Sequence, residues 1–444
     1  MKRTKHPLPS IRRWAPLRAA LLAPMALAFL GAGGAPVLAD ELGDLKAQVE
    51  ALMKRIEDLE VKQRETVKTA EEAREAAQRL PLAAPERLVT SGNDAVKRTL
   101  SGQVNRVSFV ADDGTESNTF HSDNENSSTR WRLVGTARLD EDFTVGTLIE
   151  QDIGQTNNSD SVNINQETSA GDVSFDNRHL TISLDSKRLG RLWLGKGNTS
   201  SNGIAEIDLS GTSVIEYSGL QDIGGGLSFR TEGAAAPDGP RVSGGSDALG
   251  GGVYSQFDGL SRRNRIQYDT PTIRGFKAGF TYLQGDAWDA SLRYSANFEQ
   301  AGLKVSAGAA YWNYGSRTKI AVDAFGGSIS ALHSSGLNLT VSSGTFNREA
   351  NGATIDDPVG FFIKPGWQFD LTPLGKTALS FHYAQNDDHQ AQGDEFTSWG
   401  FAGVQYIDKA SMELFAFFRQ YGLDRTGASF EDINLGGIGA RVKF

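Results

Sequence analysis

The chain ends in the stretch GGIGARVKF, residues 436–444, in which apolar and polar positions alternate one for one. One side carries Ile438, Ala440, Val442 and Phe444, and the other carries Gly437, Gly439, Arg441 and Lys443. Successive side chains of a β-strand point to opposite faces of the sheet, so this stretch is typical of a strand between two different environments. About a dozen upstream segments alternate in the same way. The repeated two-residue period predicts a β-barrel with lipid outside and water inside.

Composition excludes several other classes of protein. The chain has 444 residues with 50 glycines and no cysteine, and only 39% of its residues are hydrophobic. Without cysteine, neither disulfides nor thiolate chemistry are available. A protein with several transmembrane helices needs about 20 consecutive apolar residues for each span, which this composition does not supply.

The first 39 residues are organised like a secretory signal. A basic region that extends to Arg18 precedes the apolar residues 19–30, and Ala39 lies at the expected cleavage point. The alternative is a retained membrane anchor, which the short apolar segment and the glycines after it disfavour. Removal of residues 1–39 leaves 39 basic and 54 acidic residues, a formal charge of −15. Such acidity argues against nucleic acid as a partner.

Residues 40–80 carry the heptad pattern of a coiled coil. The first half of the apolar seam consists of Leu42, Leu45, Val49, Leu52, Ile56 and Leu59. These spacings of three and four place the side chains along one face of a helix that packs on other helices. The alternatives are a lone helix lying on the barrel and a solvated linker. A lone amphipathic helix of this kind is marginal in water, so self-association is favoured.

Pro81 and Pro85 end the helix, and residues 81–99 are predicted to be a linker. From Leu100 the period changes to two, so residues 100–444 are predicted to form an all-β transmembrane barrel of sixteen antiparallel strands. The predicted strands span residues 100–110, 128–139, 143–153, 177–185, 189–196, 262–269, 274–284, 288–300, 303–313, 318–333, 336–347, 359–370, 376–386, 396–407, 410–422 and 433–444. Bacterial single-chain barrels have an even number of strands.

The connections between these strands differ in length in a regular way. Short turns such as 140–142 and 186–188 alternate with long polar connections. The long connections are residues 111–127, 154–176, 197–261, 348–358, 387–395 and 423–432. Short periplasmic turns and long outer loops are typical of outer-membrane barrels, whereas the alternative of a soluble β-sandwich predicts no such asymmetry. We expect a barrel in the outer membrane of a Gram-negative cell, with the coiled coil in the periplasm.

The longest connection, residues 197–261, is predicted to form a constriction. A barrel of this size encloses a lumen too wide to select solutes, so a loop folded inward is needed to narrow it. We expect the loop acids Glu206, Asp208, Glu216 and Asp222 to face wall bases, for which strand alternation suggests Arg106, Arg130, Arg132, Lys196, Arg265 and Arg293. Opposed charges of this kind set up a transverse field that orients polar solutes. The alternative is a solvated surface loop and arginines that pair locally.

Acidic and amide side chains also gather in other long connections, for example Asp123, Asn124, Glu125 and Asp160. Divalent cations take carboxylate and amide oxygens, so these loops could bind cations that bridge lipopolysaccharide. A solvated loop surface is the simpler interpretation. Apart from such loop-bound cations, no metal and no other cofactor is predicted.

An outer-membrane enzyme is one competing function, and a structural tether is another. An enzyme needs a nucleophile, a base and a group that orients the base. None of the six histidines of the chain lies in a recognisable catalytic motif, so no catalytic residues are predicted. A tether would use the coiled coil to connect the outer membrane to the peptidoglycan, and it need not exclude a channel.

Several stretches resemble Gram-negative porins. LSGQVNRVSFVADDG (100–114) and DNENSSTRWRLVGTARL (123–139) are similar to the first hairpin of that family. RLGRLWLGKGNTSSNG (188–203) is similar to the strand that enters the constriction loop, and NRIQYDTPTIRGFKAGFTY (264–282) to the hairpin after it. GARVKF (439–444) resembles the closing strand, which ends in Phe. The resemblance covers roughly residues 100–444 and implies a homotrimeric channel for passive diffusion of small hydrophilic solutes and ions.

The same resemblance implies roles for individual residues. LGKGN places Lys196 at the loop entrance, and NSSTRWR places Arg130 and Arg132 on the wall. Phe444 is the expected signal for the barrel-assembly machinery, and lipid and lipopolysaccharide are the expected surroundings. The third loop is longer than in most general porins, and most of them lack a coiled coil. The coiled coil is similar to the extension of some trimeric porins selective for anions or dicarboxylates, so a selective channel is the alternative.

Overall fold

The computed structural model describes Lys54 and residues 95–444, except for 156–157, 165–172, 244–251, 318–320 and 349–355. The chain forms two units, Met1–Leu88 and Val89–Phe444. The predicted signal peptide, the seam positions from Leu42 to Leu59 and residues 81–94 of the predicted linker lie outside the described residues. The first strand begins at Val96, four residues before the predicted start at Leu100.

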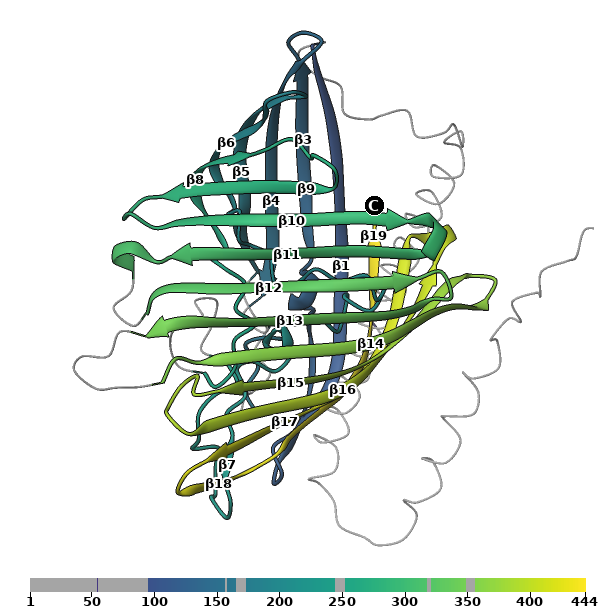
Figure 1. The fold of residues 1–444 in the computed structure, drawn as a ribbon. Helices are drawn as coiled ribbons and strands as arrows, with labels where there is room; N and C mark the ends of the chain where they lie inside the picture. Colours follow the sequence, from purple (N-terminus) through teal and green to yellow (C-terminus); the bar gives the residue numbers. More distant parts are fainter. Residues whose placement is uncertain are drawn as a thin grey trace, which may run out of the picture. The chain divides into compact units, whose positions relative to one another are not determined.

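Nineteen strands are present in the described part of the chain (Figure 1). They are β1 (Val96–Asp112), β2 (Ser117–Asp123), β3 (Arg130–Arg138), β4 (Phe143–Gln155), β5 (Val173–Ser186), β6 (Gly190–Asn198), β7 (Arg230–Thr231), β8 (Arg262–Asp269), β9 (Phe276–Leu283), β10 (Trp288–Phe298), β11 (Leu303–Asn313), β12 (Ala321–His333), β13 (Leu337–Arg348), β14 (Val359–Thr372), β15 (Gly375–Asp387), β16 (Asp394–Ile407), β17 (Met412–Arg425), β18 (Ala428–Glu431) and β19 (Ile433–Lys443).

Eighteen of these nineteen segments make the sixteen strands of the wall. β2 and β3 both pair with β1 and form one interrupted wall strand. β18 and β19 both pair with β17 in the same manner, and β7 belongs to the long loop between β6 and β8. All sixteen predicted strands are present, and the fold class is confirmed as a closed antiparallel barrel.

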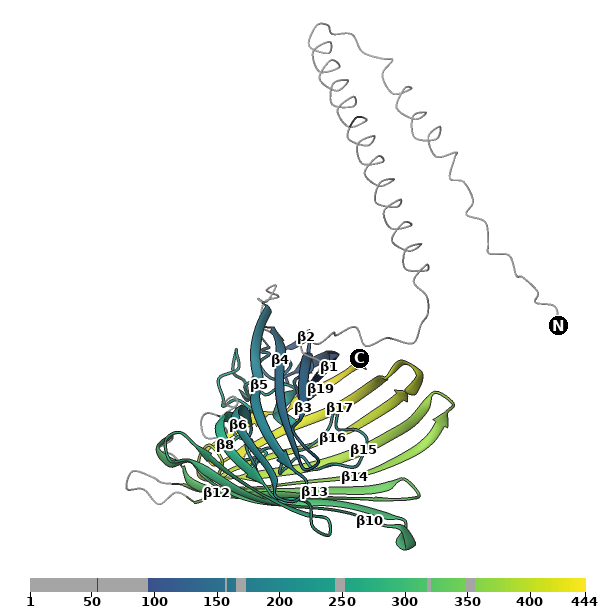
Figure 2. The same ribbon diagram turned by 90° about the horizontal axis from the view of Figure 1, so that it is seen from above.

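The sheet closes through β1 and β19, whose antiparallel register runs from Gln103 opposite Lys443 to Asp112 opposite Asn434. Phe444 continues the ladder, since its backbone N–H donates to the Gly102 carbonyl at 3.0 Å and its carbonyl accepts from Gly102 at 2.8 Å. In Figure 1, β10–β15 run across the view whereas β1, β3 and β4 run up it, and Figure 2 shows the same walls from above. Strands that tilt relative to the barrel axis cross in this way on opposite walls. Closure removes the unpaired edges that an open sheet exposes.

Alternate residues of the wall strands differ in exposure. In β6, Leu192 and Leu194 are exposed, the latter by 57%, whereas Trp193 is partly covered and Gly197 is buried. The outer surface carries large apolar residues on most wall strands, among them Leu100, Phe280, Ile329 and Phe401. This pattern is that of a lipid-facing outer surface around a polar interior. Among the described residues, no helix has the length and apolar character to cross a membrane.

The predicted connection 111–127 is not an outer loop. Part of it is a strand, and the rest is a break between two strands that folds toward the inside of the barrel. β2 pairs with the end of β1, and a 3-10 turn, η1 (Glu125–Ser127), separates β2 from β3. The break lies on the inner face of β1, because Gln103 and Asn105 donate side-chain hydrogen bonds to the Ser127 carbonyl at 2.8 and 2.9 Å. Sequence alternation did not reveal this break, since its residues are polar like those of an exposed loop.

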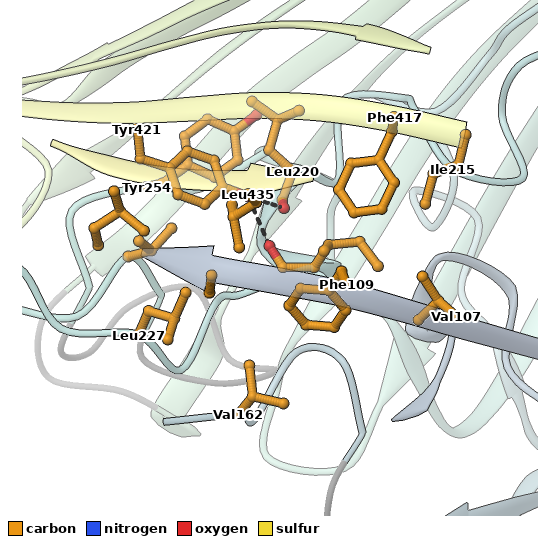
Figure 3. Close-up of a cluster of buried hydrophobic side chains, with 14 of the residues drawn as sticks. Val107, Phe109, Val162, Ile215, Leu220, Leu227, Tyr254, Phe417, Tyr421 and Leu435 are labelled. Atoms are coloured by element: carbon orange, nitrogen blue, oxygen red, sulfur yellow. Dashed lines mark hydrogen bonds between the residues drawn. The ribbon is translucent and has the colours of Figure 1, made fainter. Parts of the chain in front are cut away.

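A hydrophobic core lies inside the barrel (Figure 3). The wall contributes Phe109, Phe417, Tyr421 and Leu435, the third loop contributes Ile215, Leu220, Leu227 and Tyr254, and the second long loop contributes Val162. A second cluster packs Ile204, Phe257 and Leu260 of the third loop against Trp312 and Phe346. Full burial of a large apolar side chain contributes about 1.5–3 kcal/mol. The third loop, residues 199–261, is therefore folded against the inner wall.

Candidate functional site: the barrel lumen

The acids of the third loop that were predicted to face the lumen divide into two groups. Asp208 belongs to the first group, because it contacts Lys364, a fully buried residue on the inner face of β14. The Lys364 Nζ donates to Asp208 Oδ2 at 2.5 Å, to the Glu216 carbonyl at 2.6 Å and to Thr212 Oγ1 at 3.1 Å. Burial alone would raise the pKa of Asp208, but the charge of Lys364 outweighs it and lowers this pKa. The pair is an ionic anchor between loop and wall.

Glu216 is also an anchor. Its carboxylate is buried against β15, where one oxygen lies 2.7 Å from His382 Nδ1 and the other accepts a hydrogen bond from Ser380. Burial works to raise the pKa of Glu216, and the nearby His382 and Lys364 reverse the direction, so the pKa is lowered. Buried charges are tolerated when they are paired and hydrogen-bonded in this manner. Asp208 and Glu216 therefore hold the loop and do not face open lumen.

Arg419 on β17 fixes the middle of the loop. Its guanidinium donates to the carbonyls of Leu220 at 2.7 Å and Ile215 at 3.0 Å, and Tyr421 Oη contacts the Leu220 carbonyl at 2.7 Å. Neither Lys364 nor Arg419 was among the predicted site residues. Each occupies an inward position of a correctly predicted strand, so strand alternation could have identified both.

Two predicted wall bases, Arg293 and Arg265, lie on the inner face near the start of the loop. Arg293 on β10 donates to the carbonyls of Asn202 at 2.7 Å and Ser200 at 3.2 Å, so it also anchors the loop. Arg265 on β8 donates to Gln267 Oε1 at 2.7 Å, and its guanidinium lies 5.6 Å from the centre of the Trp193 ring. Cation–π contact and hydrogen bonding hold this guanidinium in one orientation.

Arg130 and Arg132 of β3 also lie on the inner face and share one carboxylate, Glu150 of β4. Arg132 Nε donates to Glu150 at 2.6 Å, and Arg130 Nε lies 3.9 Å from it. A third base, Arg178 of β5, donates to the same carboxylate at 2.8 Å and to Asp152 at 3.3 Å. Three guanidinium groups thus surround the buried Glu150, and this side of the lumen carries an excess of positive charge.

Arg178 could not be found by alternation. The register between β4 and β5 shifts between Glu150 and Gln151, which marks a β-bulge at Arg178. A bulge places two successive residues against one residue of the partner strand, so both Arg178 and His179 reach the inside. No signal in the sequence marks the bulge, because its residues have the same types as their neighbours.

Arg106 and Lys196 lie on the outer face, which corrects their predicted position in the constriction. Arg106 alternates in step with Val104 and Val110, which are exposed, and it forms an ion pair with Asp123 at 3.6 Å. Lys196 follows the outward-facing Leu192 and Leu194 of β6 and stands opposite the exposed Leu180. Both residues share the parity of exposed apolar residues on their own strand, so alternation itself places them on the outer face.

Glu206 and Asp222 form the second group of loop acids, which have no direct ion pair with the wall among the described residues. Gln256 Nε2 donates to Glu206 Oε1 at 3.2 Å, and the Tyr217 hydroxyl donates to Asp222. Burial raises the pKa of Glu206 although the charges of Arg262, Arg178 and Arg293 oppose this rise. The positive charges of those three arginines therefore act on Glu206.

Asp222 has a pKa near neutral. Burial raises this pKa to about 7, the hydrogen bond from Tyr217 opposes the rise, and the negative charges of Glu206 and Asp160 add to it. Asp160 belongs to the second long loop, which contacts the third loop where Ser159 Oγ donates to the Asp222 carbonyl at 2.6 Å. Asp160 was interpreted as solvated loop surface, but its loop packs inside the barrel.

No metal centre is evident in the ranges that the structure describes, where no group of three or more His, Cys, Asp or Glu side chains could hold a metal ion. Cations bound to the long loops stay a prediction. The lumen contains fixed charges of both signs, the loop carboxylates and the wall guanidinium groups, and fixed charges can orient charged solutes without transforming them.

Comparison with solved structures gives the same fold. The chain is similar to an anion-selective porin from Comamonas acidovorans, at 18% identity over 79% of this chain and 100% of that chain, with a TM-score of 0.50. It is similar to a loop L8 deletion mutant of OmpT from Vibrio cholerae at 13% identity, with 79% and 100% covered and a TM-score of 0.51. The outer membrane channel DcaP of Acinetobacter baumannii is 12% identical, with 80% and 99% covered and a TM-score of 0.51.

Sequence comparison identifies the family. No curated protein matches the chain. The sequence model of the family described as Gram-negative porin matches residues 81–426, which is more than half of the chain. Family and fold point to a channel rather than to an enzyme. The chain belongs to the Gram-negative porin family, and it is an outer-membrane channel for the passive diffusion of small hydrophilic solutes.

Proposed function

We propose that solutes pass between Glu206 and Asp222 of the third loop and the arginines of β3 and β5, and that the channel prefers anions. The observation that carries this proposal is the set of three guanidinium groups, Arg130, Arg132 and Arg178, that pair with only two carboxylates, Glu150 and Asp152. Fixed charge of one sign raises the local concentration of ions of the opposite sign.

The ionic anchors support the same direction of selectivity. Asp208 is paired with Lys364, and Glu216 is buried against His382 and Ser380 of the wall, so neither carboxylate faces the path. Asp222 has a pKa of about 7 and carries only part of its charge at neutral pH. The acidic side of the path is therefore weaker than the number of loop carboxylates suggests.

The test of this proposal is the reversal potential of the purified protein in a planar bilayer under a potassium chloride gradient. Anion preference would support the dominance of the wall arginines and an anionic nutrient as the preferred solute. Cation preference would overturn the proposed selectivity and indicate a general porin governed by the loop acids. Neutral-pH measurements at low salt are the most informative, because ions screen fixed charges beyond about 10 Å at 0.1 M salt.

We further propose that the protein is a homotrimer with a periplasmic three-stranded coiled coil formed by residues 40–80 after removal of residues 1–39. The heptad seam and the family resemblance support this assembly. A feature of the barrel supports it as well, because Arg106 lies on the outer face of β1 with 43% of its side chain exposed. A charged side chain on the lipid-facing surface is destabilising by an amount that depends on its depth, and a neighbouring protomer would remove this cost.

Deletion of residues 40–80 separates two roles of the coiled coil. A role in assembly predicts loss of the trimer in native electrophoresis. A role as a tether to peptidoglycan predicts intact trimers and intact conductance together with a weakened cell envelope. An unchanged trimer in an unchanged envelope would overturn both roles.

A further inference from the structure

A pocket lies in the lumen wall next to the start of the third loop. Its volume is about 360 Å³, within the range of about 300–1,000 Å³ that is usual for small-molecule sites. The residues that define it are Leu148, His179, Trp193, Arg265, Lys277 and Arg293. Lys277 lies just after the short β8–β9 turn, so the pocket extends from the loop toward the short-turn end of the barrel. It is separate from the arginines around Glu150.

A column of hydrogen bonds fixes the polar groups of the pocket. Arg265 Nε donates to Gln267 Oε1 at 2.7 Å, and Gln267 Nε2 donates to Asp269 Oδ1 at 2.9 Å. The other oxygen of Asp269 accepts from Trp193 Nε1 and from Lys277 Nζ, both at 3.1 Å. These side chains come from three neighbouring strands, β6, β8 and β9. The column holds the cationic groups in place before any solute arrives.

The pocket has a positive balance of charge. Arg265, Lys277 and Arg293 contribute three cations, and Asp269 is the one carboxylate among the lining residues. An ammonium group has three N–H donors, and the bond to Asp269 uses one of those of Lys277. Lys277 is also partly exposed, with 42% of its side chain accessible. It is therefore the cation best placed to meet a solute in the lumen.

Part of the lining is apolar. Leu148 of β4 and the Trp193 ring belong to it, next to the hydroxyl-bearing Ser200 and Ser291. Inorganic anions gain nothing from apolar surface, whereas a solute with a short hydrocarbon part removes some of this surface from water. The combination of fixed cations and a partly apolar wall is selective for amphiphilic anions.

We propose that this pocket is a binding subsite for small carboxylates that carry a short apolar tail, such as aliphatic monocarboxylates. The inference rests on the proposed function, because it places the subsite on the diffusion path of a channel. The carboxylate contacts Lys277 and the neighbouring guanidinium of Arg265, and the tail lies toward Leu148 and Trp193. A solute that has passed the third loop from the long-loop side is held there before it leaves the barrel.

The test uses the full-length protein in planar bilayers with the sodium salts of acetate, butyrate, hexanoate and phosphate as probes. The proposal predicts saturable block of the chloride current that strengthens from acetate to hexanoate, with phosphate no stronger than acetate. The Lys277→Gln variant is expected to weaken the block by hexanoate about fivefold, the size of a partly exposed charge contact. The matched control is Lys304→Gln, which removes the same charge from the inner face of β11 outside the pocket and is expected to leave the block unchanged.

The outcomes separate the subsite from the channel. Absence of any conductance in chloride would refute the channel itself. Normal conductance with block that does not depend on chain length would overturn the carboxylate subsite and leave the channel intact. Equal weakening of the block in Lys277→Gln and Lys304→Gln would also overturn it, since only the general charge of the lumen would then matter. A Leu148→Ser variant adds a second check, because it should flatten the chain-length dependence while the conductance in chloride persists.

Discussion

The inner faces of β14–β17 and of β3–β5 both carry basic residues, but the surroundings of these residues differ. Lys364 and Arg419 are buried under the third loop, and their hydrogen bonds go to loop carbonyls and to Asp208. Arg132 stays partly exposed, with 45% of its side chain accessible, and it shares Glu150 with two other arginines. The first set is enclosed by protein, whereas the second faces the lumen.

A charged residue on the inner wall therefore does not act on solutes unless its side chain faces the open lumen. On the β14–β17 side, the charges and the hydrophobic core together attach the loop, so that this part of the lumen is built as a protein interior (Figure 3). On the β3–β5 side, three guanidinium groups pair with two carboxylates, Glu150 and Asp152, which leaves one positive charge in excess. Of these two sets, only the second can contribute to the selection of solutes.

The largest effect is expected from Lys364→Met. Removal of one partner of a buried ion pair leaves an uncompensated charge and costs about 3–5 kcal/mol, here on Asp208. We expect the third loop to detach from β14 while the barrel stays folded, which raises single-channel conductance and opens residues 199–261 to proteolysis. Lys304→Met is the matched control on the same inner surface. A Lys364→Met protein with normal conductance and a protected loop would show that the apolar contacts alone hold the loop.

A smaller effect, confined to selectivity, is expected from Arg132→Gln. The guanidinium is partly exposed, so its loss changes the field of the lumen without unfolding a buried network. We expect the reversal potential to move toward cation preference and the anion-to-cation permeability ratio to fall about two- to threefold. Lys409→Gln, in the exposed turn before β17, removes the same charge far from the path and should leave the ratio unchanged. A similar shift in both variants would refute the distinction between the two sets of bases.

A pH dependence follows from Asp222. Its pKa of about 7 means that the carboxylate is neutral below this pH and negative above it. The anion preference should therefore rise as the pH falls from 8 to 6, since the path loses negative charge. Asp222→Asn should show the low-pH selectivity at both pH values. Reversal potentials at pH 6 and 8 measure this change, and a wild-type response that survives in Asp222→Asn would assign it to Glu206 or Asp160 instead.

The sequence sufficed for the architecture because alternation and loop length are local properties. The strands at Arg262–Asp269 and Leu303–Asn313 have the predicted bounds, and the closing strand was correctly identified. The predictions failed where tertiary context decides. The bulge at Arg178 changes the face of a residue without any change in residue type, and the break at η1 moves a polar stretch into the lumen. Strand alternation predicts the inward position of Lys364, but the role of this residue depends on contacts with a loop that is far away in sequence.

The smallest effect is expected from Tyr421→Phe, which probes the attached side of the lumen without removing a charge. The Tyr421 hydroxyl contacts the carbonyls of Leu220 and Ile223, both at 2.7 Å, and its ring packs in the core inside the barrel. Loss of one buried hydrogen bond costs about 0.5–1.5 kcal/mol, which is less than the effect of Lys364→Met. We expect a modest rise in the rate of loop proteolysis, with conductance and reversal potential unchanged. If Tyr421→Phe instead altered selectivity as Arg132→Gln does, the attached side would also border the path, and the contrast between the two sides would fail.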